Sequence, residues 1–190
     1  MTNRSGAGRR SQARPGHAAA SAVASVAESS GSTVRAVELP EFARRVSTLS
    51  RIDYTDCFVL DAGPDVKLTG EQWAREMLEG APERLRRSLR RGWFALGLRL
   101  GPVRSPEHVL GWEVRQSNDE YALLGATSRI GMPAELVFVG QPDGLLFATL
   151  VGHHNHLARS VWKAITPLHD RVVRGALERA GRAARRARRS

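Results

Sequence analysis

The sequence predicts one α+β domain in which an antiparallel sheet wraps around a long C-terminal helix. Asp53–Asp61 is a β-rich segment, and two helical patterns follow it. Four short β-type segments then occupy residues 110–151, with turn residues between them. From Leu157 the apolar residues recur every three or four positions, which is typical of an amphipathic helix. A length of 190 residues suits one such domain with tails.

The first 34 residues are rich in Arg, Ser, Ala and Gly and contain no aromatic residue. Such a composition cannot bury enough apolar surface to offset its ordering entropy, so it favours a disordered leader. Arg9-Arg10 followed by Ala18–Ala27 also faintly resembles a twin-arginine export signal, although this run contains no Leu, Ile or Phe. We expect a leader and a cytoplasmic protein, with export as the alternative.

The domain is expected over residues 35–180 and begins with a helical turn after Pro40. The strand Asp53–Asp61 follows and ends at the turn signal Gly63-Pro64. Cys57 lies in this strand and is the single cysteine of the chain, which excludes an intrachain disulfide and a cysteine-based metal cage. We expect it to be buried as a small hydrophobic residue.

Two consecutive helices are predicted after this strand, as a helical insert. Thr69 and Gln72 have the spacing of a capping box, and the helix runs to Gly80. Pro82 opens the second helix, which extends to about Leu96. One of its faces is apolar, and the other carries five arginines: Arg84, Arg86, Arg87, Arg90 and Arg91. These arginines could bind phosphate or an acidic partner. The glutamates just upstream favour instead a solvated surface with salt bridges.

Four strands are predicted next, over residues 110–115, 121–130, 135–139 and 145–151. The turns between them are short and contain Asn, Asp, Gly and Pro. Strands joined by such short connections are antiparallel neighbours.

The last helix is predicted to begin at Leu157 and to carry a continuous apolar stripe, with a kink at Pro167. The stripe is Val161, Ile165, Leu168, Val172, Ala176 and Ala180. Residues 181–190 are expected to form an arginine-rich tail. The formal net charge is +10, but residues 34–178 hold 19 basic and 18 acidic residues, so the excess lies in the two ends. Such a tail attracts nucleic acid or anionic lipid nonspecifically, or serves only for solubility.

This order of elements predicts a helix-grip fold, because only the last helix is long enough to cover the sheet. The segment 152–182 (GHHNHLARSVWKAITPLHDRVVRGALERAGR) resembles the end of an uncharacterised bacterial domain family of the START-like superfamily, which includes polyketide cyclases and birch-pollen-allergen-like proteins. Arg51-Ile52-Asp53-Tyr54 and the strand of Trp112 are also similar to that family. The resemblance covers roughly residues 51–182 and implies the fold, without an activity or catalytic residues.

His153, His154 and His156 form the densest titratable cluster. At a strand end two imidazoles on one face can ligate zinc or copper, but a third ligand is needed, from His108 or His169. General acid or base catalysis is a second possibility. Histidines at a turn between a strand and a helix more often cap the helix or face solvent. We therefore predict no metal site and keep the three histidines as weak catalytic candidates.

Aromatic and apolar residues from the sheet and the last helix surround the interior of a helix-grip domain. They form either a packed core or part of a ligand pocket. Small residues on the same strands (Gly111, Gly125, Ala126 and Ala148) leave volume that favours a pocket. The predicted ligand-binding residues are Trp112, Tyr121, Phe138, Phe147, Trp162 and Ile165.

No linear motif for phosphate binding, a nucleophile elbow or a zinc protease occurs in the chain. We therefore expect a domain that binds an apolar or amphipathic small molecule and needs no cofactor. The alternatives are a cyclase- or hydrolase-type enzyme that uses a histidine from 153–156, and association with nucleic acid or anionic membranes through the tail. The sequence leaves the oligomeric state open.

Overall fold

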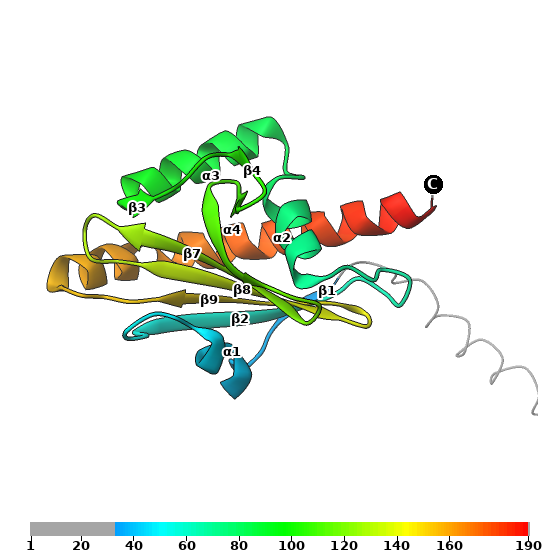
Figure 1. Ribbon diagram of the computed structural model, residues 1–190, viewed down its shortest axis with the longest axis horizontal. Helices are drawn as coiled ribbons and strands as arrows, with labels where there is room; N and C mark the ends of the chain where they lie inside the picture. Colours follow the sequence, from blue (N-terminus) through cyan, green and yellow to red (C-terminus); the bar gives the residue numbers. More distant parts are fainter. Residues whose placement is uncertain (1–32, 190) are drawn as a thin grey trace, which may run out of the picture. The chain divides into compact units, whose positions relative to one another are not determined.

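A computed structural model describes residues 33–189 of the chain. Within this range, nine strands form an antiparallel curved sheet in the order β1-β2-β9-β8-β7-β6-β5-β4, with β3 paired to β7. The long helix α4 lies along one face of this sheet (Figure 1). The strands are β1 (Thr33–Ala36), β2 (Tyr54–Asp61), β3 (Leu98–Arg99), β4 (Arg104–Ser105), β5 (His108–Val109), β6 (Trp112–Ser117), β7 (Tyr121–Ser128), β8 (Ala134–Gln141) and β9 (Gly144–Val151). The helices are α1 (Glu41–Val46), α2 (Gly70–Leu78), α3 (Glu83–Ala95) and α4 (His156–Arg189).

Alternation along the central strands divides their side chains between two apolar clusters. On β2, Phe58 and Leu60 point to the inner face, which packs against α2 and α4, while Cys57 points to the outer face beside α1. Cys57 is buried as predicted, and its burial raises the pKa of the thiol to about 11. The α+β class and the long closing helix are confirmed.

Helix α2 begins at the predicted capping box. The Thr69 hydroxyl accepts a hydrogen bond from the Gln72 amide at 3.3 Å, and the Gln72 side chain accepts one from the Thr69 amide at 2.9 Å. A side chain at Gly70 could not fit, because its Cβ would lie 2.3 Å from the Phe138 carbonyl oxygen of β8. Glycine therefore lets the start of α2 approach the sheet closely.

The strand predicted from Leu110 begins two residues later, at Trp112. Leu110 and Gly111 have φ angles of +50° and +97°, and they form the tight turn between β5 and β6. A two-residue hairpin needs this left-handed backbone to match the twist of its strands. The short strands β3, β4 and β5 were not predicted, since two-residue strands leave no alternating pattern.

The buried stripe of α4 agrees with the predicted one at Ala176 and Ala180 and differs from it at Leu168. Leu168 is 60% exposed, and the residues that pack on the inner face are Ala158, Trp162, Val173, Ala176, Leu177, Ala180 and Ala184. Alanine-rich helices offer more than one apolar face, and the larger Trp162 and Leu177 select the face that meets the sheet. The helix is continuous through Pro167, so the proline does not interrupt it.

The two ends of the predicted domain also differ in detail from the structure. β1 begins at Thr33, inside the range 1–34 assigned to a leader, and the rest of that leader lies outside the described residues. Ala184 is buried within the range assigned to the tail, and Arg188 donates a hydrogen bond to the Lys67 carbonyl at 3.2 Å. The packed part of α4 therefore extends past residue 180.

Candidate functional site

The three histidines at the start of α4 do not come together. His153 is buried, and its backbone amide donates to the Asp53 carboxylate at 2.7 Å. Burial lowers the pKa of its imidazole, and the Nε2 atom has no partner among the described residues. His154 and His156 are exposed. In the part of the chain that the structure describes, no three His, Cys, Asp or Glu side chains are placed to hold a metal ion.

Two small apolar cavities lie between the inner face of the sheet and helices α3 and α4. Their volumes are about 70 Å³ and about 60 Å³. Trp93, Leu136 and His169 border both of them, so the cavities adjoin. The first is also lined by Leu96, Leu98, Trp112, Met132, Ala134, Thr149, Val151 and Trp162. The second is also lined by Met77, Leu78, Leu89, Phe147, Val172, Val173 and Ala176.

Half of the six predicted ligand-binding residues border these cavities, namely Trp112, Phe147 and Trp162. Phe138 packs edge-on against Phe147, with ring centroids 5.0 Å apart, and Ile165 packs on the same inner cluster without lining a cavity. Tyr121 belongs to the outer face, where it packs against Phe42 of α1 at 5.2 Å. Side chains alternate between the two faces of a sheet along each strand. In the pairing of β6 with β7, the side chains of Trp112 and Tyr121 therefore point to opposite faces.

A polar cluster stands beside the cavities, built on Asp56 of β2. The Asp56 carboxylate accepts three hydrogen bonds: from His169 Nε2 at 2.8 Å, from the Tyr54 hydroxyl at 3.1 Å and from the Thr149 amide at 3.2 Å. Burial and the nearby carboxylate raise the pKa of the Tyr54 phenol, so this group stays protonated and donates. We call Tyr54, Asp56 and His169 the Asp56 cluster.

The Asp56 cluster fixes the hydrogen-bonding role of His169. Because an ionised carboxylate only accepts, the Nε2 atom that faces it carries the proton. A neutral imidazole in this tautomer leaves Nδ1 as an acceptor. The His169 ring also packs against Trp162, with centroids 5.0 Å apart. His169 therefore supplies an oriented polar group at the boundary of the two cavities.

Three residues around the first cavity carry buried polar atoms with no partner among the described residues: Trp112 Nε1, Trp162 Nε1 and Thr149 Oγ1. A buried donor without an acceptor costs about 1–3 kcal/mol. An apolar wall with a few polar groups is the usual composition of a small-molecule site. These residues can therefore donate to a polar atom of a molecule placed between the sheet and α4.

Helix α3 covers the cavities without being buried itself. None of its residues is buried, and Leu89 and Trp93 reach the cavities while half-exposed. Trp93 stands edge-on to Trp112, with ring centroids 5.4 Å apart and planes 89° apart. Among the described residues, the Arg86 side chain donates a hydrogen bond to the Glu79 carbonyl at 3.2 Å, on the connection to α2 rather than on the sheet. The contacts that hold α3 to the sheet are therefore mainly apolar ones, made by Leu89 and Trp93.

Sequence reasoning missed the centre of this site. The sequence predicts His169 only as a possible third metal ligand and Trp93 only as part of the apolar face of its helix, and it marks neither Asp56 nor Thr149 as a site residue. A signal was available in β2, because Asp56 sits at an alternating position between Tyr54 and Phe58 on an otherwise apolar inner face. A carboxylate at such a position needs hydrogen-bonding partners, and their identity depends on the register of β2 with β9 and on the rotation of α4.

None of the helices within residues 33–189 has the length and apolar character needed to cross a bilayer. No known family model, curated protein or solved structure matches this chain.

Proposed function

We propose that this protein is a START-like domain that binds an apolar or amphipathic small molecule between the inner face of the sheet and helices α3 and α4. The observation that carries the proposal is the pair of adjoining apolar cavities, bordered by His169 and by the partnerless donors of Trp112, Trp162 and Thr149. The order of two helices, an antiparallel run of strands and a closing helix supports the superfamily assignment.

The ligand needs more room than the two cavities now offer. Small-molecule sites usually measure roughly 300–1,000 Å³, whereas these cavities measure about 70 and 60 Å³. Trp93 borders both, so moving its indole outward joins them into one space. This movement uncovers part of Trp112, which is only 2% exposed, so the bound ligand has to cover that apolar surface in its place. Binding therefore proceeds with displacement of α3.

The polar groups select the kind of ligand. His169 lines both cavities, and the indole and hydroxyl groups around the first cavity offer donors. An apolar molecule with a hydroxyl or carbonyl group at one end satisfies them, whereas a hydrocarbon leaves them without partners. The ligand class is accordingly a mostly apolar molecule with one or two oxygen atoms.

The test uses an uncharged fluorescent probe, N-phenyl-1-naphthylamine, titrated into the full chain. We expect saturable uptake, and a higher melting temperature at saturation because the ligand binds only the folded state. Ala176→Leu fills the second cavity and is expected to lower the affinity for the probe at least threefold. Ala164→Leu, on the exposed side of α4, leaves this affinity unchanged. Absence of uptake for this probe and for a panel of lipids and polyketide-like compounds would overturn the proposal.

A second variant pair tests the displacement of α3. Trp93→Ala opens the space between the cavities and is expected to strengthen probe binding at least threefold, while lowering the melting temperature. Leu157→Ala, at an exposed position of α4, changes neither by a comparable amount. Equal probe affinity in Trp93→Ala and the unmodified chain would show that Trp93 does not control the site.

Association through the arginine tail is a second candidate function. Arg186 and Arg188 at the end of α4 are exposed, which favours contact with a polyanion. Deletion from residue 181 onward would remove the buried Ala184, so the test replaces Arg186, Arg188 and Arg189 by serine. Loss of binding to DNA or to phosphatidylglycerol vesicles at low salt supports this function, and unchanged binding excludes it.

A further inference from the structure

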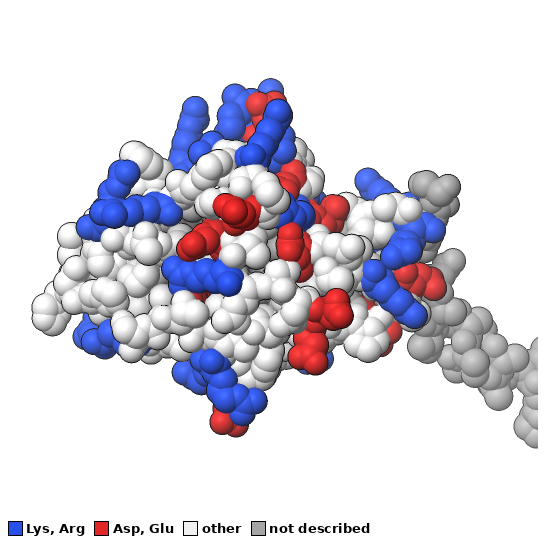
Figure 2. Space-filling view, viewed as in Figure 1, with Lys and Arg blue, Asp and Glu red and all other residues white. Residues whose placement is uncertain are grey.

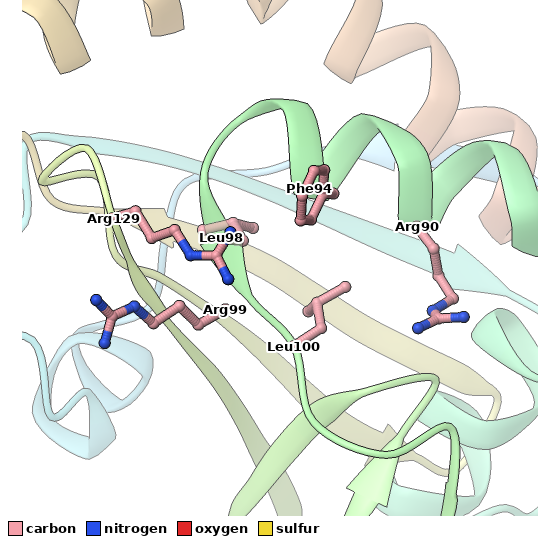
Figure 3. A pocket seen from close by; sticks show the side chains of 6 residues that line it. All are labelled: Arg90, Phe94, Leu98, Arg99, Leu100 and Arg129. Carbon is pink, nitrogen blue, oxygen red and sulfur yellow. The ribbon is translucent and has the colours of Figure 1, made fainter.

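A pocket of about 420 Å³ lies beside the C-terminal half of α3 and β3, and it shares Leu98 with the lining of the first interior cavity. Its polar wall consists of three arginines, Arg90, Arg99 and Arg129, and its apolar wall of Phe94, Leu98 and Leu100. In Figure 3, Arg129 and Arg90 lie on either side of Phe94 and Leu100, while Arg99 extends outward. We call this the arginine pocket. Its volume lies within the usual range for small-molecule sites, roughly 300–1,000 Å³.

The three arginines come from segments that the backbone ties together. Arg90 is on α3, Arg99 is on β3 and Arg129 follows β7. β3 pairs with β7, and the Arg129 amide donates to the Gly97 carbonyl at 2.8 Å. Gly97 has a φ of +73°, which allows the sharp turn from α3 into β3. The pocket is therefore held by main-chain contacts.

The charge of the arginine pocket is not balanced by the protein. Within residues 33–189, none of its three arginines forms an ion pair with a carboxylate. Arg87, on the same helix, does pair with Glu83, at 3.5 Å. In Figure 2, Lys and Arg side chains gather where α3 and β3 lie, with few acidic ones among them. Guanidinium groups recognise phosphate and carboxylate in this situation, and they bind phosphate bidentately.

The apolar wall narrows the class of anion. The Phe94 side chain is 65% exposed, and the Arg129 guanidinium lies over its ring at 5.4 Å from the centroid. Leu100 is half-buried beside it. A plain phosphate ion would use only the arginines and leave this surface in water. A phosphate ester with a hydrocarbon or aromatic group would cover it as well.

From these contacts we propose that the arginine pocket binds a phosphate ester that carries an apolar group, at a site that borders the first interior cavity only at Leu98. Arg90 and Arg129 hold the phosphate oxygens, Arg99 adds positive charge at the rim, and Phe94 and Leu100 pack on the apolar group. Such a compound exists free in solution or as the headgroup region of an anionic lipid, and both present the same chemistry to the pocket.

The test titrates octyl phosphate and inorganic phosphate into the full chain, below the concentration at which octyl phosphate forms micelles. We expect octyl phosphate to bind saturably, and inorganic phosphate to bind at least tenfold more weakly. We expect the triple variant Arg90→Gln, Arg99→Gln, Arg129→Gln to bind octyl phosphate with an affinity at least tenfold lower. The matched variant Arg84→Gln, Arg87→Gln, Arg91→Gln removes the same charge from exposed positions of α3 and changes the affinity less than threefold. All six arginines are outside the core, and melting temperatures verify the folding of both variants.

Vesicles of phosphatidylcholine with one third phosphatidic acid distinguish the two sources. If the pocket variant loses binding of soluble octyl phosphate, the ligand is a free ester. If it loses binding of the vesicles only, the ligand is a lipid headgroup. The arginine tail is the same in both triple variants, so it does not affect their difference. Equal losses in the two variants would overturn the proposal, and so would inorganic phosphate binding as tightly as octyl phosphate. Uptake of the uncharged probe is measured in parallel. A chain that binds the probe but not octyl phosphate contradicts the arginine-pocket proposal alone and leaves the proposed interior site intact.

Discussion

Asp56 of β2 and His169 of α4 lie 113 positions apart in the sequence, and their side chains meet at 2.8 Å. The contact joins the closing helix to the sheet in the middle of an otherwise apolar interface. The carboxylate also accepts from Tyr54 and Thr149, so one side chain satisfies donors from β2, β9 and α4. This relationship fixes both the position of α4 over the sheet and the orientation of the His169 ring beside the cavities.

Asp56→Ala is expected to lower the free energy of unfolding by about 1–3 kcal/mol, because it leaves three donors without an acceptor. His169→Ala and the double variant complete a cycle, and we expect the two single effects to sum to more than the double effect by about 0.5–3 kcal/mol. Urea denaturation measures all of them. Asp65→Ala, at an exposed position, serves as the control. Additive effects of Asp56→Ala and His169→Ala would mean that the contact does not couple the helix to the sheet.

A second buried carboxylate stabilises the outer face. Glu135 of β8 is fully buried and pairs with Arg115 at 2.6 Å, and it also accepts from the Ser47 and Thr48 hydroxyls at 2.5 and 2.6 Å. Glu135→Ala leaves these donors unpaired and is expected to cost about 3–5 kcal/mol of stability.

Glu113 provides the matched control for this prediction, because its carboxylate lies 3.5 Å from the same Arg115 but is 61% exposed. Glu113→Ala is expected to cost less than about 1 kcal/mol, since exposed ion pairs contribute little. Chemical denaturation compares the two variants. A similar loss of stability for both would contradict the role assigned to burial at Glu135.

Stability is expected to depend on pH through His153. Burial lowers the pKa of its imidazole in the folded chain, and the positive charges of Arg159 and Arg51 lower it further, against the opposing effect of Asp53. Below the unfolded pKa of about 6.5 the unfolded chain therefore binds more protons than the folded one, and stability falls as the pH falls towards the folded pKa.

His153→Gln is expected to reduce the slope of the free energy of unfolding against pH in this window, below about pH 6.5. His154→Gln changes an exposed imidazole and is expected to leave the slope as it is. Urea denaturation at a series of pH values measures both slopes. The contribution of Asp53, whose pKa is lowered by the Arg51 side chain, is lost at lower pH, as the carboxyl protonates. An unchanged slope in His153→Gln would exclude the buried imidazole as its source.

The last turns of α4 provide a test of where the packed domain ends. Ala184 is 6% exposed and packs on the inner cluster, whereas Ala187 is exposed. Ala184→Glu is expected to lower stability by about 2 kcal/mol or more, because it places an unpaired charge in an apolar contact. Ala187→Glu is expected to change stability by less than about 0.5 kcal/mol. Thermal unfolding of both variants decides whether the helix is packed as far as residue 184.

Local signals in the sequence were sufficient for most of the elements. The capping box at Thr69 and Gln72 located the start of α2, and β-rich segments bounded by turn residues located β2 and the four strands from β6 to β9. The change of period after Val151 located α4. Each of these signals depends on contacts within one element or between neighbours along the chain. Strands of two residues, such as β3 and β5, carry no such signal.

The candidate site depended on contacts that no local pattern encodes. The sequence by itself determined that a sheet would be closed by a long amphipathic helix, because periodicity is a property of consecutive residues. Only the tertiary structure decided that α4 turns Trp162 rather than Leu168 to the sheet, and that His169 meets Asp56. It likewise placed Tyr121 on the outer face and brought Arg90, Arg99 and Arg129 to one pocket. The physical reason is that the rotation of a helix and the register of distant strands follow from packing all the elements together.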